Sequence, residues 1–513
     1  MTVDETLAPV QAPTTGARRV LPAGLGAAIV FLASAAVLVL EIVAMRLVAP
    51  YIGITLQTSS AVIGVALSAM ALGAWTGGRL ADRRDAQRLL APALVGAGIL
   101  AAVTVPAVRL AGEHVRGSDS PLAVLTFAVL AVFAPSALLS TVTPMVVKTQ
   151  LADLGRTGST VGRLSGIATL GAITATFLTG FVLLGAFGSS SIVLGTGGLL
   201  VVAGLALLVR RPDRRTLVAA AVAVPLLPWL FAGSPNPCQF ETDYHCASVV
   251  ETPPGSSTRE LRLDTLAHGQ ADLDDPGQLA YAYLQAMAAA VDGVHDAGTA
   301  VKGLYLGAGA MSLPRYEEAT RPGSTADVLE IDPGVVRIDA EYLGTGDVRG
   351  VNVRYGDGRT LVHDTPQGGY DVVVGDAFGG VAVPWHLTTV EAATDLRARL
   401  APGGVYVLNL IDSAPDAFAR AELATLRRVF PHVVVAADPA TLAGTEGSGG
   451  NHVVIAATSP LPVERIAAAL HRTTPQWRLR DEQATAAFAR GGQILTDDYA
   501  PVDQLFTQHS EQE

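Results

Sequence analysis

Residues 301–332, VKGLYLGAGAMSLPRYEEATRPGSTADVLEID, contain the pattern that decides the fold of the C-terminal half of the chain. The apolar run VKGLYLG predicts a buried strand, SLPRYEEAT predicts a helix, and ADVLEID predicts a second strand. The Gly-rich turn GAGA connects the first strand to the helix. Two buried strands joined by a helix form a βαβ unit, in which the strands run parallel. The stretch therefore predicts an α/β domain built around a parallel sheet.

The same alternation continues on both sides of this unit. Residues 245–251 and 259–265 predict a β-hairpin, because two alternating strands flank the turn TPPGSST, and a helix follows at 276–291. Beyond the unit, helices are predicted at 334–343 and 388–400, and strands at 351–358, 370–377, 403–412, 432–437 and 451–458. Residues 441–451, TLAGTEGSGGN, are expected to form a flexible loop before a final edge strand.

The N-terminal half differs in composition. Over the whole chain of 513 residues, 50% are hydrophobic and 16% are charged, with a mean hydropathy of +0.39, whereas soluble domains carry about 25% charged residues. Seven apolar stretches are long enough to cross about 30 Å of hydrocarbon: 24–48, 57–78, 89–111, 121–146, 164–186, 190–209 and 216–233. Small residues, as in GVALSAMALGAWTGG, suit close packing of such helices. The predicted segments are a cytoplasmic tail (1–20), a transmembrane bundle (21–233), a linker with hairpin and lead-in helix (234–298) and a Rossmann-like domain (299–513).

Charged residues predict an orientation for the bundle. Of the 35 basic and 46 acidic residues, 16 and 9 precede residue 234, which gives +7 for that part and −18 for the remainder. One side of the bundle collects thirteen basic residues: Arg18, Arg19, Arg79, Arg83, Arg84, Arg88, Lys148, Arg156, Arg163, Arg210, Arg211, Arg214 and Arg215. The opposite connections hold Arg109 and Arg116. The positive-inside rule places the basic side in the cytoplasm and, after seven spans, the C-terminal domain outside. If the short seventh span, with Pro225 and Pro228, does not cross, that domain is cytoplasmic.

Four further residues near or within the spans have two interpretations each. Cys238 and Cys246 follow span seven closely, and a disulfide between them would persist only in an oxidising compartment; reduced thiols are the alternative. Glu41 and Arg46 lie within the first span, where ionisable side chains are costly and often functional. The plainer interpretation is that Arg46 extends to the membrane surface and Glu41 pairs with a neighbouring helix.

Glycines or carboxylates follow four strands of the predicted sheet. Gly307 and Gly309 allow a ligand to approach the backbone closely, and Glu330 ends the next strand, where a carboxylate can accept hydrogen bonds from ribose hydroxyls. Asp357 and Asp376 follow the third and fourth strands. Because ligands in open α/β sheets bind beyond the carboxyl ends of the strands, the four positions together predict a nucleoside-type site. Taken singly, each has a plainer interpretation as a turn, a helix cap or a solvated residue.

Residues 244–412 resemble the polyamine aminopropyltransferases (spermidine synthases), which have the class I methyltransferase Rossmann fold. The whole chain resembles bacterial membrane proteins with a fused spermidine synthase-like domain. The family's N-terminal hairpin matches residues 246–265, with Leu263-Asp264, and its Tyr-His-Glu helix motif matches Tyr281-Ala282-Tyr283, of which only the tyrosine is kept. The family's Gly-Gly-Gly-Asp-Gly-Gly loop matches residues 307–312, GAGAMS.

The remaining matches imply roles for the strand-end carboxylates. Glu330 matches the family's ribose-binding acidic residue, Asp357 the acidic residue beside adenine, and Asp376 the catalytic aspartate. The downstream Leu-Phe-Thr pattern of the family resembles His386-Leu387-Thr388.

The resemblance implies transfer of an aminopropyl group from decarboxylated S-adenosylmethionine to putrescine, without a metal or a tightly bound cofactor. It implies Asp376 as general base or proton acceptor and Tyr281 as the residue that orients the amine, with positioning supplying much of the rate. It also implies a homodimer. An acidic domain attracts cationic polyamines, although solubility alone explains its charge equally well.

Two departures from the family keep other functions open. Ala310 occupies the place of the aspartate that holds the propylamine nitrogen, and Tyr281 lacks the His and Glu of its motif. The alternatives are an S-adenosylmethionine-dependent methyltransferase and a non-catalytic sensor that binds a polyamine or nucleoside and is coupled to the bundle. Asp497 and Asp498 are expected to lie in a solvated turn or to line a cation site. No His or Cys spacing predicts a metal site, and the soluble half has no basic, aromatic patch for nucleic acid.

Overall fold

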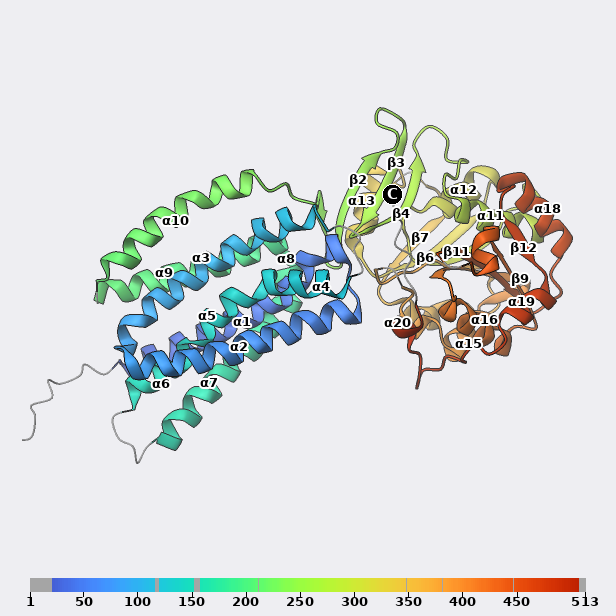
Figure 1. The fold of residues 1–513 in the computed structure, drawn as a ribbon. Helices are drawn as coiled ribbons and strands as arrows, with labels where there is room; N and C mark the ends of the chain where they lie inside the picture. Colours follow the sequence, from blue (N-terminus) through green and yellow to red (C-terminus); the bar gives the residue numbers. More distant parts are fainter. Residues whose placement is uncertain are drawn as a thin grey trace, which may run out of the picture.

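The computed structural model describes residues 21–115, 120–151, 157–210, 212–346, 348–380, 382–445 and 447–506. The predicted tail at 1–20 lies outside this range, as do five residues of the charge pattern: Arg18, Arg19, Arg116, Arg156 and Arg211. The chain forms a bundle of long helices from its N-terminal half and an α/β domain from its C-terminal half, which sits at one end of the bundle (Figure 1).

Within the described residues, seven helices are long and apolar enough to cross a membrane, in agreement with the seven apolar stretches of the sequence. They are α1 (Ala23–Ile52), α2 (Leu56–Arg83), α3 (Ala86–Gly112), a fourth made of α4 (Pro121–Ala128), η1 (Val129–Phe133), α5 (Ala134–Ser140) and α6 (Val142–Gln150), a fifth made of α7 (Thr157–Leu178), η3 (Thr179–Leu183) and α8 (Leu184–Ala186), α9 (Ser189–Arg210) and α10 (Arg214–Ala232). Helix α10 continues through Pro225 and Pro228 for 19 residues, or about 28 Å at 1.5 Å per residue. This length is close to the thickness of the hydrocarbon core, and 19 residues fall within the range of about 17 to 25 that membrane-spanning helices have.

Glycines allow the helices of the bundle to pack closely. A methyl group at Gly73 would lie 2.1 Å from the backbone oxygen of Ala137, and one at Gly77 would lie 2.6 Å from Cα of Thr141. Both glycines belong to the small-residue stretch 64–78 of α2. A larger side chain at either position would force the helices apart, which is the packing role expected of these residues.

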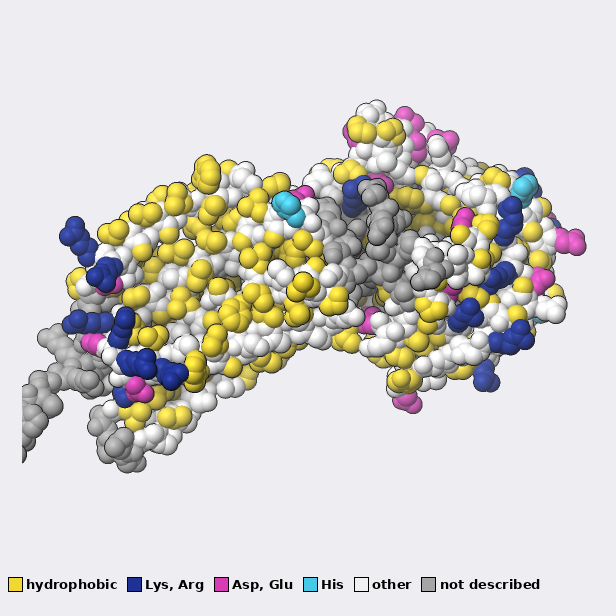
Figure 2. All heavy atoms as spheres, viewed as in Figure 1, with side chains coloured by type: hydrophobic (Ala, Val, Ile, Leu, Met, Phe, Trp, Pro, Cys, Tyr) yellow, Lys and Arg dark blue, Asp and Glu magenta, His cyan; other side chains and the backbone are white. Residues whose placement is uncertain are grey.

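Lys and Arg side chains gather at the end of the bundle that faces away from the α/β domain (Figure 2). Hydrophobic side chains cover the flank of the bundle between this basic end and the domain, and the exposed ones include Leu67, Phe181 and Trp229. The opposite end of the bundle contacts the domain. The junction thus joins a bundle with a hydrophobic flank to the α/β domain.

The chain after the bundle forms a four-stranded antiparallel sheet. Its strands are β1 (Phe240–Glu241), β2 (Cys246–Glu251), β3 (Thr258–Leu263) and β4 (Leu266–Asp272), in that order. The predicted hairpin corresponds to β2 and β3, and β1 and β4 extend it on either side. A disulfide joins Cys238, in the segment after α10, to Cys246 at the start of β2, so the two cysteines are paired.

The second sheet has eight strands in the order β12-β10-β11-β9-β8-β5-β6-β7. Its strands are β5 (Lys302–Leu306), β6 (Thr325–Glu330), β7 (Val351–Tyr355), β8 (Tyr370–Gly375), β9 (Leu400–Ser413), β10 (His432–Ala437), β11 (Gly449–Ala457) and β12 (Arg478–Arg480). Strands β5 to β9 pair in parallel. The predicted α/β class, with a Rossmann-like, class I methyltransferase arrangement, is confirmed.

Helices cover both faces of this sheet because alternate strand residues point to opposite sides. In β5, Leu304 and Leu306 join the core under α15 and α16, and Tyr305 joins the core under α11 and α18. The helices and helical turns are α11 (Ala282–Val294), α12 (Ser312–Thr320), α13 (Pro333–Tyr342), α14 (Gly358–Leu361), η4 (Val362–Asp364), η5 (Trp385–Leu387), α15 (Val390–Arg397), α16 (Ala417–Val429), α17 (Pro439–Ala443), α18 (Val463–Thr473), α19 (Glu482–Phe488) and α20 (Val502–Leu505).

The structure corrects the prediction for residues 441–451 and for the final strand. Residues 439–443 form the short helix α17, and β11 begins at Gly449, so the loop is much shorter than expected. Strand β11 is not at the edge; it lies between β9 and β10, and β12 forms the edge. Burial on both faces explains this position, because His452 and the apolar residues after it are all excluded from solvent.

Candidate active site at the carboxyl ends of the parallel strands

The turn after β5 has a backbone that favours glycine. Gly307 has φ of +96° and Gly309 has φ of +49°, both in the left-handed range. A methyl group at Gly307 would lie 2.5 Å from the backbone oxygen of Asp376, and the Asp376 amide donates to the Leu306 carbonyl at 3.1 Å. The glycine turn and Asp376 are therefore in direct backbone contact, as expected for the ends of adjacent parallel strands.

Glu330, the last residue of β6, is bound to the same turn. Its Oε2 accepts the amide of Ala308 at 2.8 Å and its Oε1 accepts the amide of Asp332 at 2.8 Å. The side chain is buried, and this burial raises the pKa of Glu330 against the two amide hydrogen bonds. Each carboxylate oxygen can accept a second hydrogen bond. Glu330 is thus fixed in one orientation and keeps lone pairs for ligand hydroxyls.

Asp376, after β8, has the environment of a proton acceptor. Its Oδ1 accepts Nδ2 of Asn409 at 2.8 Å, and Asn409 Oδ1 accepts Nδ2 of Asn451 at 3.0 Å. Burial raises the pKa of Asp376 to about 6, and the hydrogen bond from Asn409 opposes this rise. A carboxyl group with this pKa is ionised at pH 7 and takes up a proton more readily than an exposed aspartate.

Two tyrosines at the start of α11 differ in their partners. The hydroxyl of Tyr281 donates to Oε2 of Glu260 in β3 at 2.8 Å, and its ring stacks on Tyr283 with centroids 5.9 Å apart. Burial raises the pKa of Tyr283, and the charge of Asp376 is the next largest cause. Tyr283 therefore lies within the field of Asp376, whereas the Tyr281 hydroxyl is held by the small sheet.

Asp357 follows β7 and caps α14, where its Oδ1 accepts the amide of Thr360 at 3.2 Å. Its other oxygen lies 3.0 Å from Nε2 of His386 in η5. The two side chains are partly exposed, and Trp385 packs edge-on against the His386 ring. The predicted adenine-side carboxylate is thus paired with a histidine.

Ala310 is buried against the small sheet. Its exposed fraction is 1%, and a methyl group at Gly269 of β4 would lie 2.7 Å from its Cβ. Strand β4 also approaches Gly309 through the His268 carbonyl. Burial lowers the pKa of the His268 imidazole to about 4, so this side chain is neutral at pH 7. The position at which the resemblance to the aminopropyltransferases implies a carboxylate is thus filled by packed apolar atoms.

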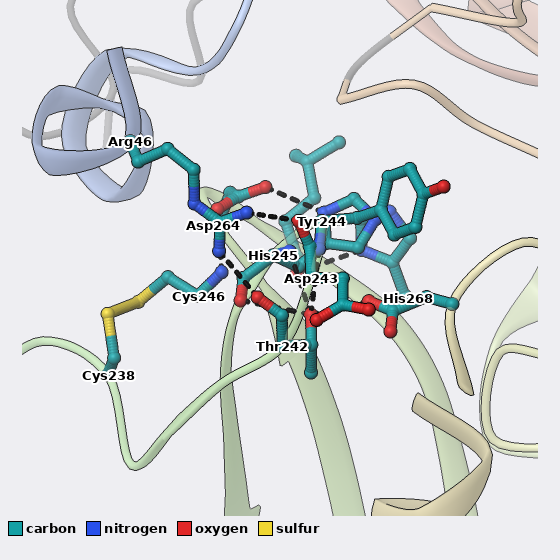
Figure 3. A network of polar contacts seen from close by, with 11 residues as sticks. Arg46, Cys238, Thr242, Asp243, Tyr244, His245, Cys246, Asp264 and His268 are labelled. Carbon is teal, nitrogen blue, oxygen red and sulfur yellow. Dashed lines mark hydrogen bonds and ion pairs between the residues drawn. A yellow bond between two sulfur atoms is a disulfide. The ribbon is translucent and has the colours of Figure 1, made fainter. Parts of the chain in front are cut away.

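Tyr244 was not predicted as a site residue. It precedes β2, is 44% exposed, and lies in Figure 3 with its ring directed away from Arg46. Burial of part of the phenol raises the pKa of Tyr244, followed by the charges of four nearby carboxylates: Asp332, Asp243, Asp357 and Glu330. The position of Tyr244 among them depends on how the linker folds back onto the Rossmann domain, and only the isolated aromatic residue in the polar stretch 241–245 hints at it.

The structure shows which partners the two C-terminal aspartates, Asp497 and Asp498, have. Asp497 accepts Oγ1 of Thr389 at 2.6 Å and Nη2 of Arg359 at 3.1 Å, and Asp498 is exposed. Because an arginine already neutralises Asp497, these contacts favour the turn over a cation site. Among the described residues, no three His, Cys, Asp or Glu side chains are grouped to hold a metal ion.

The sequence is similar to polyamine aminopropyltransferases over part of its length. A polyamine aminopropyltransferase from Vibrio vulnificus is 27% identical over 214 residues, which cover 39% of this chain and 69% of that protein. A probable polyamine aminopropyl transferase from Bifidobacterium longum is 30% identical over 117 residues, or 22% of this chain and 25% of that protein. The chain thus spans just over two thirds of the first relative and a quarter of the second. No family model matches the chain.

Among solved structures, a probable spermidine synthase from Corynebacterium glutamicum is 26% identical to this chain. The match covers 51% of this chain and 96% of that one, with a TM-score of 0.47.

Proposed function

We propose that this chain, in which seven apolar helices precede a spermidine synthase-like domain, is a membrane-anchored transferase that moves an aminopropyl group from decarboxylated S-adenosylmethionine to a polyamine acceptor such as putrescine. The observation that carries the proposal is the arrangement around β5, β6 and β8, where Glu330 and Asp376 both contact the Gly307–Gly309 turn. The Glu330 carboxylate is suited to bind the nucleoside, and the Asp376 carboxylate is suited to accept a proton.

The donor would bind across the ends of β5, β6 and β7. Glu330 would accept hydrogen bonds from the two ribose hydroxyls, because its carboxylate is already oriented by two backbone amides. The left-handed glycines Gly307 and Gly309 leave the backbone of the turn uncovered by side chains of their own. Asp357, with His386, would lie on the adenine side.

Transfer to the polyamine needs a group that takes a proton from the attacking nitrogen, and it needs that nitrogen aligned with the carbon next to the sulfonium. Asp376 would take one proton from the acceptor ammonium; the neutral nitrogen then attacks the carbon next to the sulfonium. The N–C bond forms as the C–S bond breaks, its electron pair goes to sulfur, and methylthioadenosine leaves. The product nitrogen is a secondary ammonium, and the proton on Asp376 passes to solvent. Tyr283 and Tyr281 would line the amine side, Tyr283 within the field of Asp376 and Tyr281 stacked on it.

Donor preference tests this assignment. We expect decarboxylated S-adenosylmethionine to bind about tenfold more tightly than the intact molecule, because Glu330, Asp357 and Asp376 repel the methionine carboxylate. Titration calorimetry with the purified full-length chain measures both dissociation constants. Equal or tighter binding of intact S-adenosylmethionine would contradict the proposal and support a methyltransferase, the candidate that Ala310 favours because no carboxylate stands there to hold a propylamine group.

The bundle supports a multi-pass membrane location. The basic end of the bundle faces away from the domain (Figure 2), and the positive-inside rule places such an end in the cytoplasm. The Cys238–Cys246 disulfide agrees with an oxidising compartment for the domain. We propose that the domain is extracytoplasmic.

This placement predicts the behaviour of two reporters. An alkaline phosphatase fused to the C-terminus should be active and a fluorescent protein fused there should be dark, and fusions after Arg84, in the connection between α2 and α3, should give the reverse. A fluorescent C-terminal fusion would place the domain in the cytoplasm. With the domain on that side, the transferase needs its donor supplied outside the cytoplasm; a chain that binds methylthioadenosine but forms no product there would instead be a binding module for polyamines or nucleosides.

A further inference from the structure

Arg46 of membrane helix α1 reaches out of the bundle to the linker that precedes the small sheet. Its Nη2 donates to the carbonyl oxygen of Thr242 at 2.6 Å, and its Nη1 donates to the carbonyl oxygen of Asp243 (Figure 3). Arg46 lies six residues before the end of α1, or about 9 Å along the helix axis. A guanidinium near the end of an apolar helix is costly unless its donors are satisfied. Here backbone carbonyls almost 200 residues away satisfy two of them.

Thr242 connects Arg46 to the Rossmann domain through a second hydrogen bond. Its hydroxyl donates to Oδ2 of Asp332, and both side chains are buried. The amide of Asp332 in turn donates to Oε1 of Glu330 at 2.8 Å. A methyl group at Gly334 would lie 2.5 Å from Cγ2 of Thr242, so the linker is packed tightly against the start of α13. Arg46 is therefore three hydrogen bonds from the carboxylate that faces the nucleoside site.

Other contacts hold the same linker from the opposite side. Asp264, in the turn between β3 and β4, accepts the amide of Cys246 at 3.0 Å and contacts Nδ1 of His245 at 2.8 Å (Figure 3). The disulfide ties Cys246 to Cys238. These contacts restrain the linker after Thr242, and Arg46 holds Thr242 and Asp243 from the side of the bundle.

We propose that Arg46 is a positioning residue for the nucleoside site. Through Thr242 and Asp332 it sets the orientation of Glu330, and it also sets the position of the neighbouring Tyr244. The membrane bundle and the donor site are thereby coupled. The inference rests on the proposed function in that Glu330 is taken as the nucleoside-binding carboxylate. Arg46 touches neither substrate nor reacting atoms, and its role is to fix the geometry of residues that do.

Arg109 of α3 is a matched control at the same junction. Its Nη2 donates to Ser190 Oγ and to Asn236 Oδ1, both at 3.0 Å, and its Nη1 reaches the Ser234 carbonyl at 3.4 Å. Arg109 thus also ties the bundle to the linker through a guanidinium, but its contacts end before Thr242. Both arginines can anchor the domain to the bundle. Of the two, it is Arg46 that is linked to Glu330 by the hydrogen bonds through Thr242 and Asp332.

The test is the affinity of the full-length chain for methylthioadenosine, measured by titration calorimetry. This probe contains the nucleoside of either donor and no transferable aminopropyl group, so its binding is independent of the reaction catalysed. We expect Arg46→Gln and Thr242→Val each to raise its Kd about tenfold, and the double variant to raise it no further, because both residues act in one path. Arg109→Gln should stay within about twofold of the wild type. Thr242→Ser, which keeps the hydroxyl, should restore tight binding.

Each other outcome overturns the inference. An unchanged Kd for Arg46→Gln, an equal rise for Arg109→Gln, or multiplying effects in the double variant would show that Arg46 does not act through Thr242. If Arg46→Gln fails to fold, Thr242→Val decides, because its substitution lies outside the bundle; wild-type affinity in that variant rejects the path. Failure of the wild-type chain to bind methylthioadenosine would reject the nucleoside site as well, and so separates failure of the proposed function from failure of the Arg46 role.

Discussion

Replacing Asp376 by Asn should lower kcat for aminopropyl transfer at least about a hundredfold, the usual contribution of a general base. The amide cannot take the proton from the acceptor, but its Oδ1 can still accept the hydrogen bond that Asn409 donates. We therefore expect the Kd for the donor and the thermal stability to change little. Initial rates of product formation at saturating donor and acceptor measure the effect.

The pH dependence gives a second measurement on the same residue. Because burial raises the pKa of Asp376 to about 6, its basic form is lost as the pH falls through about 6, and kcat should fall below that pH and level off above it. Asp327→Asn is a matched control, since that carboxylate lies in β6 and binds Tyr370 and Asn352. Wild-type turnover in Asp376→Asn, or a kcat independent of pH between 5 and 8, would exclude Asp376 as the base.

Glu330→Ala should raise the Kd for methylthioadenosine about a hundredfold. Two hydrogen bonds from ribose hydroxyls to a carboxylate are lost, at about 1.5 kcal/mol or more each. The amides of Ala308 and Asp332 also lose their acceptor, so the turn is less ordered before binding. Once saturated with donor, the variant should keep much of its kcat, because Glu330 does not contact the reacting carbon in this assignment.

A ligand change provides the control for this prediction. The 2′,3′-dideoxy form of methylthioadenosine should bind the wild-type chain as weakly as methylthioadenosine binds Glu330→Ala, and the variant should not distinguish the two ligands. Glu464→Ala, an exposed carboxylate on α18, should leave both affinities unchanged. A Glu330→Ala variant that still prefers the ribose form would assign recognition of the hydroxyls to another residue.

The helices of the bundle and the strands β5 to β9 could be predicted because their signals are local. Each span is one apolar run, and each parallel strand is a short apolar run bounded by turns. Strands β4 and β12 could not be predicted from local apolar patterns, for a physical reason. The sequence of β4, LAHGQAD, has little apolar alternation, and β12 has three residues that pair only with β10. Their pairing partners, rather than their own side chains, determine these strands.

The same distinction separates the site residues. Gly307, Glu330 and Asp376 lie at the carboxyl ends of three neighbouring parallel strands, β5, β6 and β8, so the fold itself brings them to one edge of the sheet. There the Glu330 carboxylate and the Asp376 backbone both contact the glycine turn. Tyr244 and His386 come from segments whose direction no local pattern fixes. Arg46 could be recognised as an unusual residue in an apolar helix, but its contacts with Thr242 and Asp243 depend on how the bundle packs against the linker, almost 200 residues away in the chain.

Product analysis of the full-length chain tests the central claim most directly. The purified protein, reconstituted in lipid, is incubated with decarboxylated S-adenosylmethionine and putrescine, and the nucleoside and amine products are quantified by mass spectrometry. We predict methylthioadenosine and an aminopropylated amine in equal amounts, with both lost in Asp376→Asn. No methylthioadenosine above the level of that variant, or S-adenosylhomocysteine formed from intact S-adenosylmethionine instead, would contradict the assignment of this chain as an aminopropyltransferase.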